Sequence, residues 1–147
     1  MDAAPTALQS GYRGYITPRL VRGSRTPQHV QNLVIRDYAA RNGLLFKLSA
    51  TEYVMPGCTM ILQSVLDELP TLEGIIAFSL FMLPRNQERR RRIYQRVLDS
   101  EAGLHFAVEG VALTAPVDMD RVEDILAIER SLANASAPGT LWTGAEG

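Results

Sequence analysis

Apolar and polar positions divide the chain into segments that predict strands and helices in turn. Short segments dominated by apolar residues predict strands over residues 11–17, 44–50, 74–80 and 104–109. Longer segments with apolar residues three or four positions apart predict helices over residues 27–42, 58–69, 86–100 and 118–133. The strand at 74–80 reads GIIAFSL, and such a continuous apolar run is typical of a strand buried on both faces.

This alternation predicts an α/β fold of three layers. Crossovers between parallel strands are right-handed, so they place helices on both faces of a mostly parallel sheet of four to five strands. We expect a single domain over residues 11–133. Small and polar residues dominate both ends, so we expect a flexible N-terminus over residues 1–10 and a flexible tail over 134–147.

Composition narrows the class of protein. The chain has 147 residues, 46% of them hydrophobic and 21% charged, which is ordinary for a globular domain. The net charge of −1 argues against a protein whose main task is non-specific nucleic-acid binding. No secretory signal and no apolar run of about 20 residues is present, so we expect a cytoplasmic protein with no membrane contact. Cys58 is the only cysteine, which excludes an intrachain disulfide.

A candidate pocket is expected where the parallel strands end. Ligand sites in such sheets lie beyond the carboxyl ends of the strands, which here are the loops 17–27, 50–57, 80–86 and 109–117. No phosphate loop, dinucleotide turn or nucleophile elbow occurs, and the two histidines are far apart in sequence. We therefore expect neither a redox cofactor nor a metal.

The first of these loops carries Arg19, Arg22 and Arg25 shortly before a helix that begins at Pro27. Guanidinium groups beside a helix N-terminus favour anion binding, because free N–H groups and the helix dipole attract negative charge. His29 adds a group that titrates near neutral pH. The alternative is a solvated loop in which the arginines bond backbone carbonyls.

Carboxylates follow two of the other strands. Glu52 comes after the second strand and is expected to face the same crevice, where it would pair with an arginine or with His29 for acid–base chemistry. The alternative is helix capping. Glu109 ends the fourth predicted strand and lies four positions from His105, hence on the same face. The run Arg89–Arg92 covers a full helical turn, so its side chains are expected to fan out around the helix as a solvated, ion-paired surface.

Five strings occur in a characteristic order and spacing: GYRGYI, PQHVQNLVIRDY, LSATEY, SLFMLP and LHFAVE. Together they resemble the sporadic carbohydrate cluster protein family, small bacterial proteins found among sugar-biosynthesis genes, over about residues 11–130. The resemblance implies a role in making or modifying a nucleotide- or phosphate-activated sugar. The residues within the family pattern are Arg13, Tyr15, Arg25, Gln28, His29, Asn32, Ser49, Glu52, Tyr53 and Glu109.

The order of elements also resembles the serine recombinase catalytic domain. That family's Tyr-x-Arg-Val-Ser motif corresponds to residues 15–19, where Thr17 replaces the arginine and Arg19 replaces the nucleophilic serine. Its Leu-Asp-Arg-Leu-Gly-Arg motif corresponds to residues 80–85, where Arg85 is the only one of the motif's charged residues that is kept. This resemblance implies a resolvase- or flavodoxin-like scaffold without the recombinase reaction.

The leading hypothesis is a small enzyme of carbohydrate biosynthesis that acts on a phosphorylated or nucleotide-linked sugar. Arg19, Arg22 and Arg25 would hold the anion. His29 and Glu52 would exchange protons in an isomerisation, epimerisation or elimination. The other residues assigned to substrate binding are Arg13, Tyr15, Gln28, Ser49, Tyr53 and Glu109.

Two alternatives belong to other classes of protein. One is a non-catalytic module, derived from a recombinase-like scaffold, that binds a sugar nucleotide or a partner enzyme. The other is nucleic-acid binding through residues 85–96, against which the net charge argues. We expect a homodimer or a higher homo-oligomer, because a small open sheet leaves exposed edges and a recombinase-like scaffold commonly pairs through helices.

Overall fold

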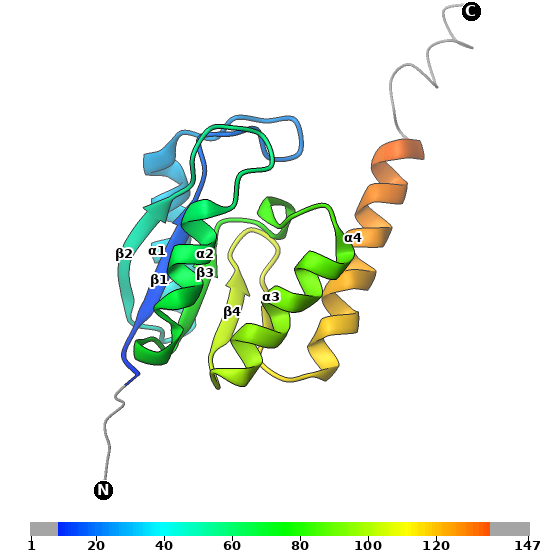
Figure 1. Cartoon of the computed structure of the whole chain (residues 1–147). Coiled ribbons are helices and arrows are strands. Elements are labelled where there is room, and N and C mark those ends of the chain that lie inside the picture. Colours follow the sequence, from blue (N-terminus) through cyan, green and yellow to red (C-terminus); the bar gives the residue numbers. More distant parts are fainter. Residues whose placement is uncertain (1–8, 136–147) are drawn as a thin grey trace, which may run out of the picture.

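The computed structural model describes residues 9–135 and confirms the predicted α/β fold (Figure 1). Five strands form one sheet in the order β2-β1-β3-β4-β5. The strands are β1 Tyr12–Ile16, β2 Phe46–Thr51, β3 Gly74–Ala77, β4 Gly103–Phe106 and β5 Val111–Leu113. The helices are α1 Gln28–Arg41, α2 Met60–Asp67, α3 Gln87–Asp99 and α4 Val117–Ala135, with short 3-10 helices η2 Leu69–Thr71 and η3 Leu80–Met82.

The first four strands run parallel, and the fifth is antiparallel. The strand predicted over residues 104–109 ends at Phe106, and the chain then turns back to form β5. Gly110 permits this turn because it adopts a positive φ of 66°. Glu109 therefore lies in the turn and does not share a strand face with His105, which corrects the prediction made from their spacing.

Helices cover both faces of the sheet. In Figure 1, α2 and α3 lie side by side in front of the sheet, and α1 lies behind it. α1 packs on β1, β2 and β3, whereas α4 packs on β5. The core between the layers is continuous, and its largest fully buried side chains include Tyr15, Ile76, Tyr94 and Phe106.

The N-terminal end of the described chain is attached to the body. The Gln9 amide donates to the Ser100 carbonyl at 2.8 Å, and the Ser10 N–H donates to the Thr71 carbonyl. The rest of the predicted flexible ends falls on residues 1–8 and 136–147, which lie outside the described residues, and on residues 134 and 135, which belong to α4. Within residues 9–135, no helix has the length and apolar character needed to cross a membrane.

Candidate functional site

Glu52 is buried and surrounded by donors. Its side chain is 2% exposed and accepts hydrogen bonds from the Tyr15 hydroxyl at 2.6 Å and from the N–H groups of Tyr53, Ile61 and Leu62 at 3.0–3.1 Å. Ile61 and Leu62 lie in the first turn of α2, so the carboxylate satisfies N–H groups that have no partner within the helix. The predicted pairing of Glu52 with an arginine or with His29 is not formed, and the capping alternative describes its contacts.

These contacts also determine the protonation of the pair. Burial by itself would raise the pKa of Glu52, but the hydrogen bonds from Tyr15 and from the three N–H groups outweigh it and lower the pKa below the ordinary 4.5. Burial, followed by the hydrogen bond to Glu52, raises the pKa of the Tyr15 hydroxyl. Tyr15 thus stays protonated and Glu52 stays ionised at neutral pH, which suits an anchor better than a proton shuttle.

The arginines of the first loop do not converge. Arg19 donates through Nε to the Thr17 hydroxyl and through Nη1 to the carbonyls of Met55 and Cys58, at 2.9–3.1 Å. Arg22 pairs with Glu129 at 2.9 Å and lies over the Phe81 ring. Arg25 is exposed. Two of the three guanidinium groups are therefore committed to different parts of the protein, and the predicted three-arginine anion site is not formed.

Gln31 has a structural role that the sequence analysis missed. It is fully buried, its Oε1 accepts from the Thr17 N–H, and its Nε2 donates to the carbonyls of Thr17 and Thr26. The side chain thereby joins the two ends of the loop between β1 and α1. Gln28 and His29, which were singled out in its place, are exposed in the first turn of α1. The PQHVQN string contained both glutamines, and only the packing distinguishes them.

Other predicted site residues lie apart. Arg13 lies near the amino end of β1 and is 3.6 Å from Glu68, so it is not at the carboxyl edge of the sheet. Ser49 donates to Asn32 of α1 at 2.5 Å. Glu109 accepts from the Ser79 hydroxyl and the Leu80 N–H, and so holds the start of η3. Tyr53 is 48% exposed.

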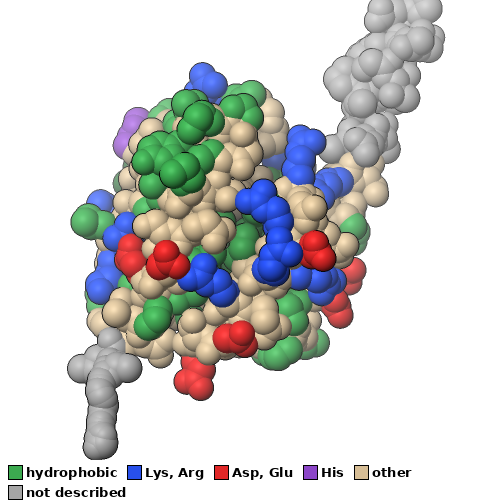
Figure 2. All heavy atoms as spheres, viewed as in Figure 1, with side chains coloured by type: hydrophobic (Ala, Val, Ile, Leu, Met, Phe, Trp, Pro, Cys, Tyr) green, Lys and Arg blue, Asp and Glu red, His purple; other side chains and the backbone are tan. Residues whose placement is uncertain are grey.

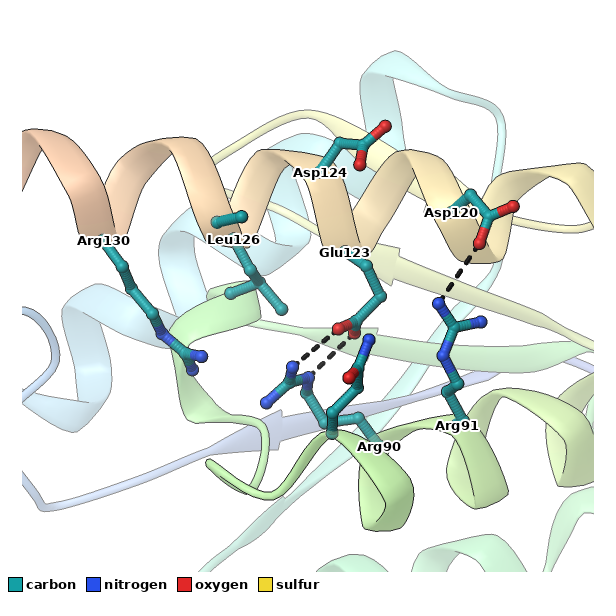
Figure 3. A pocket seen from close by; sticks show the side chains of 9 residues that line it. Arg90, Arg91, Asp120, Glu123, Asp124, Leu126 and Arg130 are labelled. Carbon is teal, nitrogen blue, oxygen red and sulfur yellow. Dashed lines mark hydrogen bonds and ion pairs between the residues drawn. The ribbon is translucent and has the colours of Figure 1, made fainter.

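Side chains of the arginine run on α3 fan out, as expected from the helical spacing. Arg90 is buried and forms a bidentate pair with Glu123 of α4 at 2.6 and 2.8 Å (Figure 3). The Tyr94 hydroxyl donates to the same carboxylate. Burial by itself would raise the pKa of Glu123, but the hydrogen bonds from Arg90 and Tyr94 outweigh it and lower the pKa. Arg91 pairs with exposed Asp120 at 3.2 Å. These contacts connect α3 to α4.

Two hollows flank α3, and their charges differ. The hollow of about 340 Å³ between α3 and α4 has three arginines and three carboxylates among its lining residues, and two of these arginines pair with two of the carboxylates (Figure 3). The hollow of about 360 Å³ between α2 and α3 contains no acidic lining residue. We call the second hollow the arginine groove, and its lining residues are Gln63, Leu66, Arg89, Arg92, Ile93 and Arg96.

The arginine groove is open to solvent and basic. Arg89, Arg92 and Arg96 are spaced three and four positions apart, so they share one face of α3. Figure 2 shows Lys and Arg side chains gathered on this face of the molecule. Glu88 and Asp67 contact Arg92 and Arg96 at the margin of the groove, and exposed ion pairs of this kind contribute little to stability. Within residues 9–135, no cluster of side chains suited to a metal ion occurs.

Comparison with known proteins identifies related folds but no sequence family. No protein-family model and no curated protein matches the chain. A resolvase family site-specific recombinase from Streptococcus pneumoniae is similar in structure, with a TM-score of 0.57 and 13% identity over 92% of this chain and 99% of that chain. The N-terminal catalytic domain of TP901-1 integrase has a TM-score of 0.53 and 16% identity over 82% of this chain and 98% of that chain. At such identities the likeness is one of fold.

These findings correct three of the predictions. The recombinase-like scaffold is confirmed, whereas the resemblance to the sporadic carbohydrate cluster family has no support. The hypothesis of a carbohydrate-biosynthesis isomerase, epimerase or lyase is wrong on this comparison, because the structural neighbours are recombinase domains. The expectation that nucleic acid is an unlikely partner is also corrected, because the structural neighbours are a site-specific recombinase and an integrase domain and because the arginine groove holds three arginines and no acidic lining residue.

Proposed function

We propose that the chain is a nucleic-acid-binding domain on a recombinase-like scaffold and that it binds without cutting. The observation that carries the proposal is the arginine groove, in which Arg89, Arg92 and Arg96 face solvent together and no acidic residue lines the hollow. Arginine suits phosphodiester recognition because its planar guanidinium donates two parallel hydrogen bonds and remains charged. The recombinase fold of the neighbours supports nucleic acid as the polyanion.

The loop after β1 supports binding without strand cleavage. In the motif comparison, Arg19 takes the position of the nucleophilic serine and Thr17 that of the first arginine. Both are engaged in structural contacts, because Arg19 holds the carbonyls of Met55 and Cys58 and Thr17 accepts from Arg19. A guanidinium group cannot replace a serine hydroxyl as a nucleophile, so strand exchange by that route is not available.

The salt dependence of binding tests the proposal. On a duplex, three phosphate contacts predict a slope of about −2.7 for log affinity against log salt, so affinity falls about 40-fold between roughly 50 and 200 mM salt. On a single strand the same three contacts predict a slope of about −2.1. The variant R89Q/R92Q/R96Q should bind a fluorescent 30-mer duplex and a single strand more weakly, with most of this slope lost. R36Q/R41Q/R121Q is the matched control, because it removes three exposed arginines from α1 and α4.

The outcome is decided by comparing the two triple variants by fluorescence anisotropy. The proposal predicts that the α1/α4 control binds like the wild type while the groove variant does not. An absence of binding to both oligonucleotides at 50 mM salt, or equal losses in both variants, would overturn it. Nicking of supercoiled plasmid by the wild-type protein would contradict the non-cleaving part.

A further inference from the structure

Large apolar side chains are exposed at the carboxyl end of the sheet, beside the arginine groove. We call them the apolar rim, and they are Leu20, Tyr53, Val54, Met55 and Met60, with exposed fractions of 48–64%. Figure 2 shows hydrophobic side chains gathered at the end of the molecule where Figure 1 places the loops after β1 and β2. This patch and the basic side chains over α3 are visible on the same face.

Polar contacts hold the backbone of the rim in place. Glu52 accepts from the Tyr53 N–H, and Arg19 donates to the carbonyls of Met55 and Cys58, so both ends of the loop are anchored. Cys58 also donates its N–H to the Met55 carbonyl, closing a turn that contains Gly57 at a φ of 75°. The apolar side chains are therefore presented to solvent by an ordered backbone, and binding a partner there costs little conformational entropy.

The rim continues into the arginine groove. Thr59 follows the loop directly, and its hydroxyl accepts from Arg89 at 2.9 Å. Met60 opens α2 three positions before Gln63, so a rim residue and a groove residue share one face of that helix. The apolar rim and the arginine groove are therefore neighbours at the start of α2.

We propose that the apolar rim stacks on unpaired bases of the strand whose phosphates the arginine groove holds, so the domain prefers single-stranded or locally unpaired nucleic acid. This inference rests on the proposed function. A duplex presents phosphates outward and keeps the faces of its bases stacked inside, so it can use the groove but not the rim. Unpaired bases expose their faces, which stack on aromatic side chains and pack against apolar ones with little regard to sequence. Tyr53 is the stacking residue in this arrangement.

Competition between strand forms tests the inference. Wild-type protein should bind a labelled 20-nucleotide strand at least 10-fold more tightly than the same sequence as a duplex. Y53A should weaken single-strand binding about 5- to 150-fold, which is the range for loss of one base–aromatic stack, and should leave duplex binding unchanged. Y53F keeps the ring and should bind like the wild type. L45S/L48S is the matched control, because it removes exposed apolar side chains of the β2 segment.

The design separates failure of this inference from failure of the proposed function. Suppose that R89Q/R92Q/R96Q weakens binding to both the single strand and the duplex, but that Y53A leaves the ratio of single-strand to duplex affinity unchanged. The proposed function is then supported and the inference about the apolar rim is overturned. If the groove variant changes neither affinity, the proposed function itself fails. A rim variant that alters the sedimentation of the protein alone, without altering single-strand binding, would assign the rim to a second copy of the chain and overturn the inference.

Discussion

Replacement of Glu123 by leucine should be among the most damaging single changes in the protein. The Glu123 carboxylate pairs with Arg90 through two hydrogen bonds (Figure 3). It accepts a third hydrogen bond from the Tyr94 hydroxyl at 2.6 Å. The side chains of Arg90 and Glu123 are only 5% and 8% exposed. Leucine fills a similar volume but leaves a buried guanidinium without a counter-ion and a buried hydroxyl without an acceptor.

The magnitude follows from this burial. Removing one partner of a buried ion pair costs about 3–5 kcal/mol, because the remaining charge is desolvated without compensation. This is a large share of the roughly 5–15 kcal/mol that stabilises a typical domain. For a chain of this size it corresponds to a fall in Tm of about 6–20 °C. Arg90 keeps its bonds to the carbonyls of Pro84 and Arg85, which favours the lower half of the range.

Equilibrium unfolding in urea measures the effect. D120N is the control, because Asp120 pairs with Arg91 between the same two helices but is 82% exposed, and its loss should cost less than about 1 kcal/mol. R90M/Y94F/E123L removes all three polar partners together and should recover most of the loss. A cost below about 1 kcal/mol for E123L, or a cost equal to that of D120N, would refute the burial argument.

Two further predictions concern stability and pH. E52Q should weaken the attachment of α2 to the sheet, because the stability from the lowered pKa of Glu52 is present above about pH 4.5 and is lost as pH falls. The unfolding free energies of wild type and variant, measured in urea, should therefore converge in acid, and they would not converge if Glu52 were merely solvated. His105 lies 2.7 Å from the Tyr38 hydroxyl, and burial lowers the pKa of His105 below 6.5. Because the unfolded chain binds the proton first, the free energy of unfolding should fall as pH drops below about 6.5. H105Q should flatten that part of the plot of stability against pH, whereas an unchanged plot would contradict the lowered pKa.

Local signals in the sequence located some elements closely. α1 begins one residue after Pro27 and ends at Arg41, just before Asn42 and Gly43, because the proline and the Asn-Gly pair act on the backbone where they stand. The bounds of α2 are less accurate: the predicted helix began at Cys58 and ran to Leu69. At its N-terminal end, α2 begins where Glu52, from the loop after β2, binds the N–H groups of the first turn. At its C-terminal end, α2 is followed by the separate 3-10 helix η2, which contains Pro70.

The candidate site was less predictable than the fold. The strand ends drew attention to Tyr15 and Glu52, and the structure brings these two together across 37 positions of sequence. Their contact attaches the first turn of α2 to β1, and neither a tyrosine nor a glutamate in the sequence indicates such a structural role by itself. The groove on α3 was expected only as a solvated surface, because four consecutive arginines look alike in the sequence. The positions of α2 and α4 decide that Arg90 is buried while Arg89 and Arg92 line a groove.

Hydrophobic periodicity acts over neighbouring residues, so the alternation of strands and helices and the mostly parallel, three-layered class of fold could be predicted from the sequence. The same sequence excluded an intrachain disulfide and a recombinase serine at the motif position. Tertiary packing was needed to distinguish the charged side chains that pair within the protein from those that line an open groove. A charged side chain has the same local preferences in either case, and its role depends on whether a distant segment supplies a counter-ion and removes water.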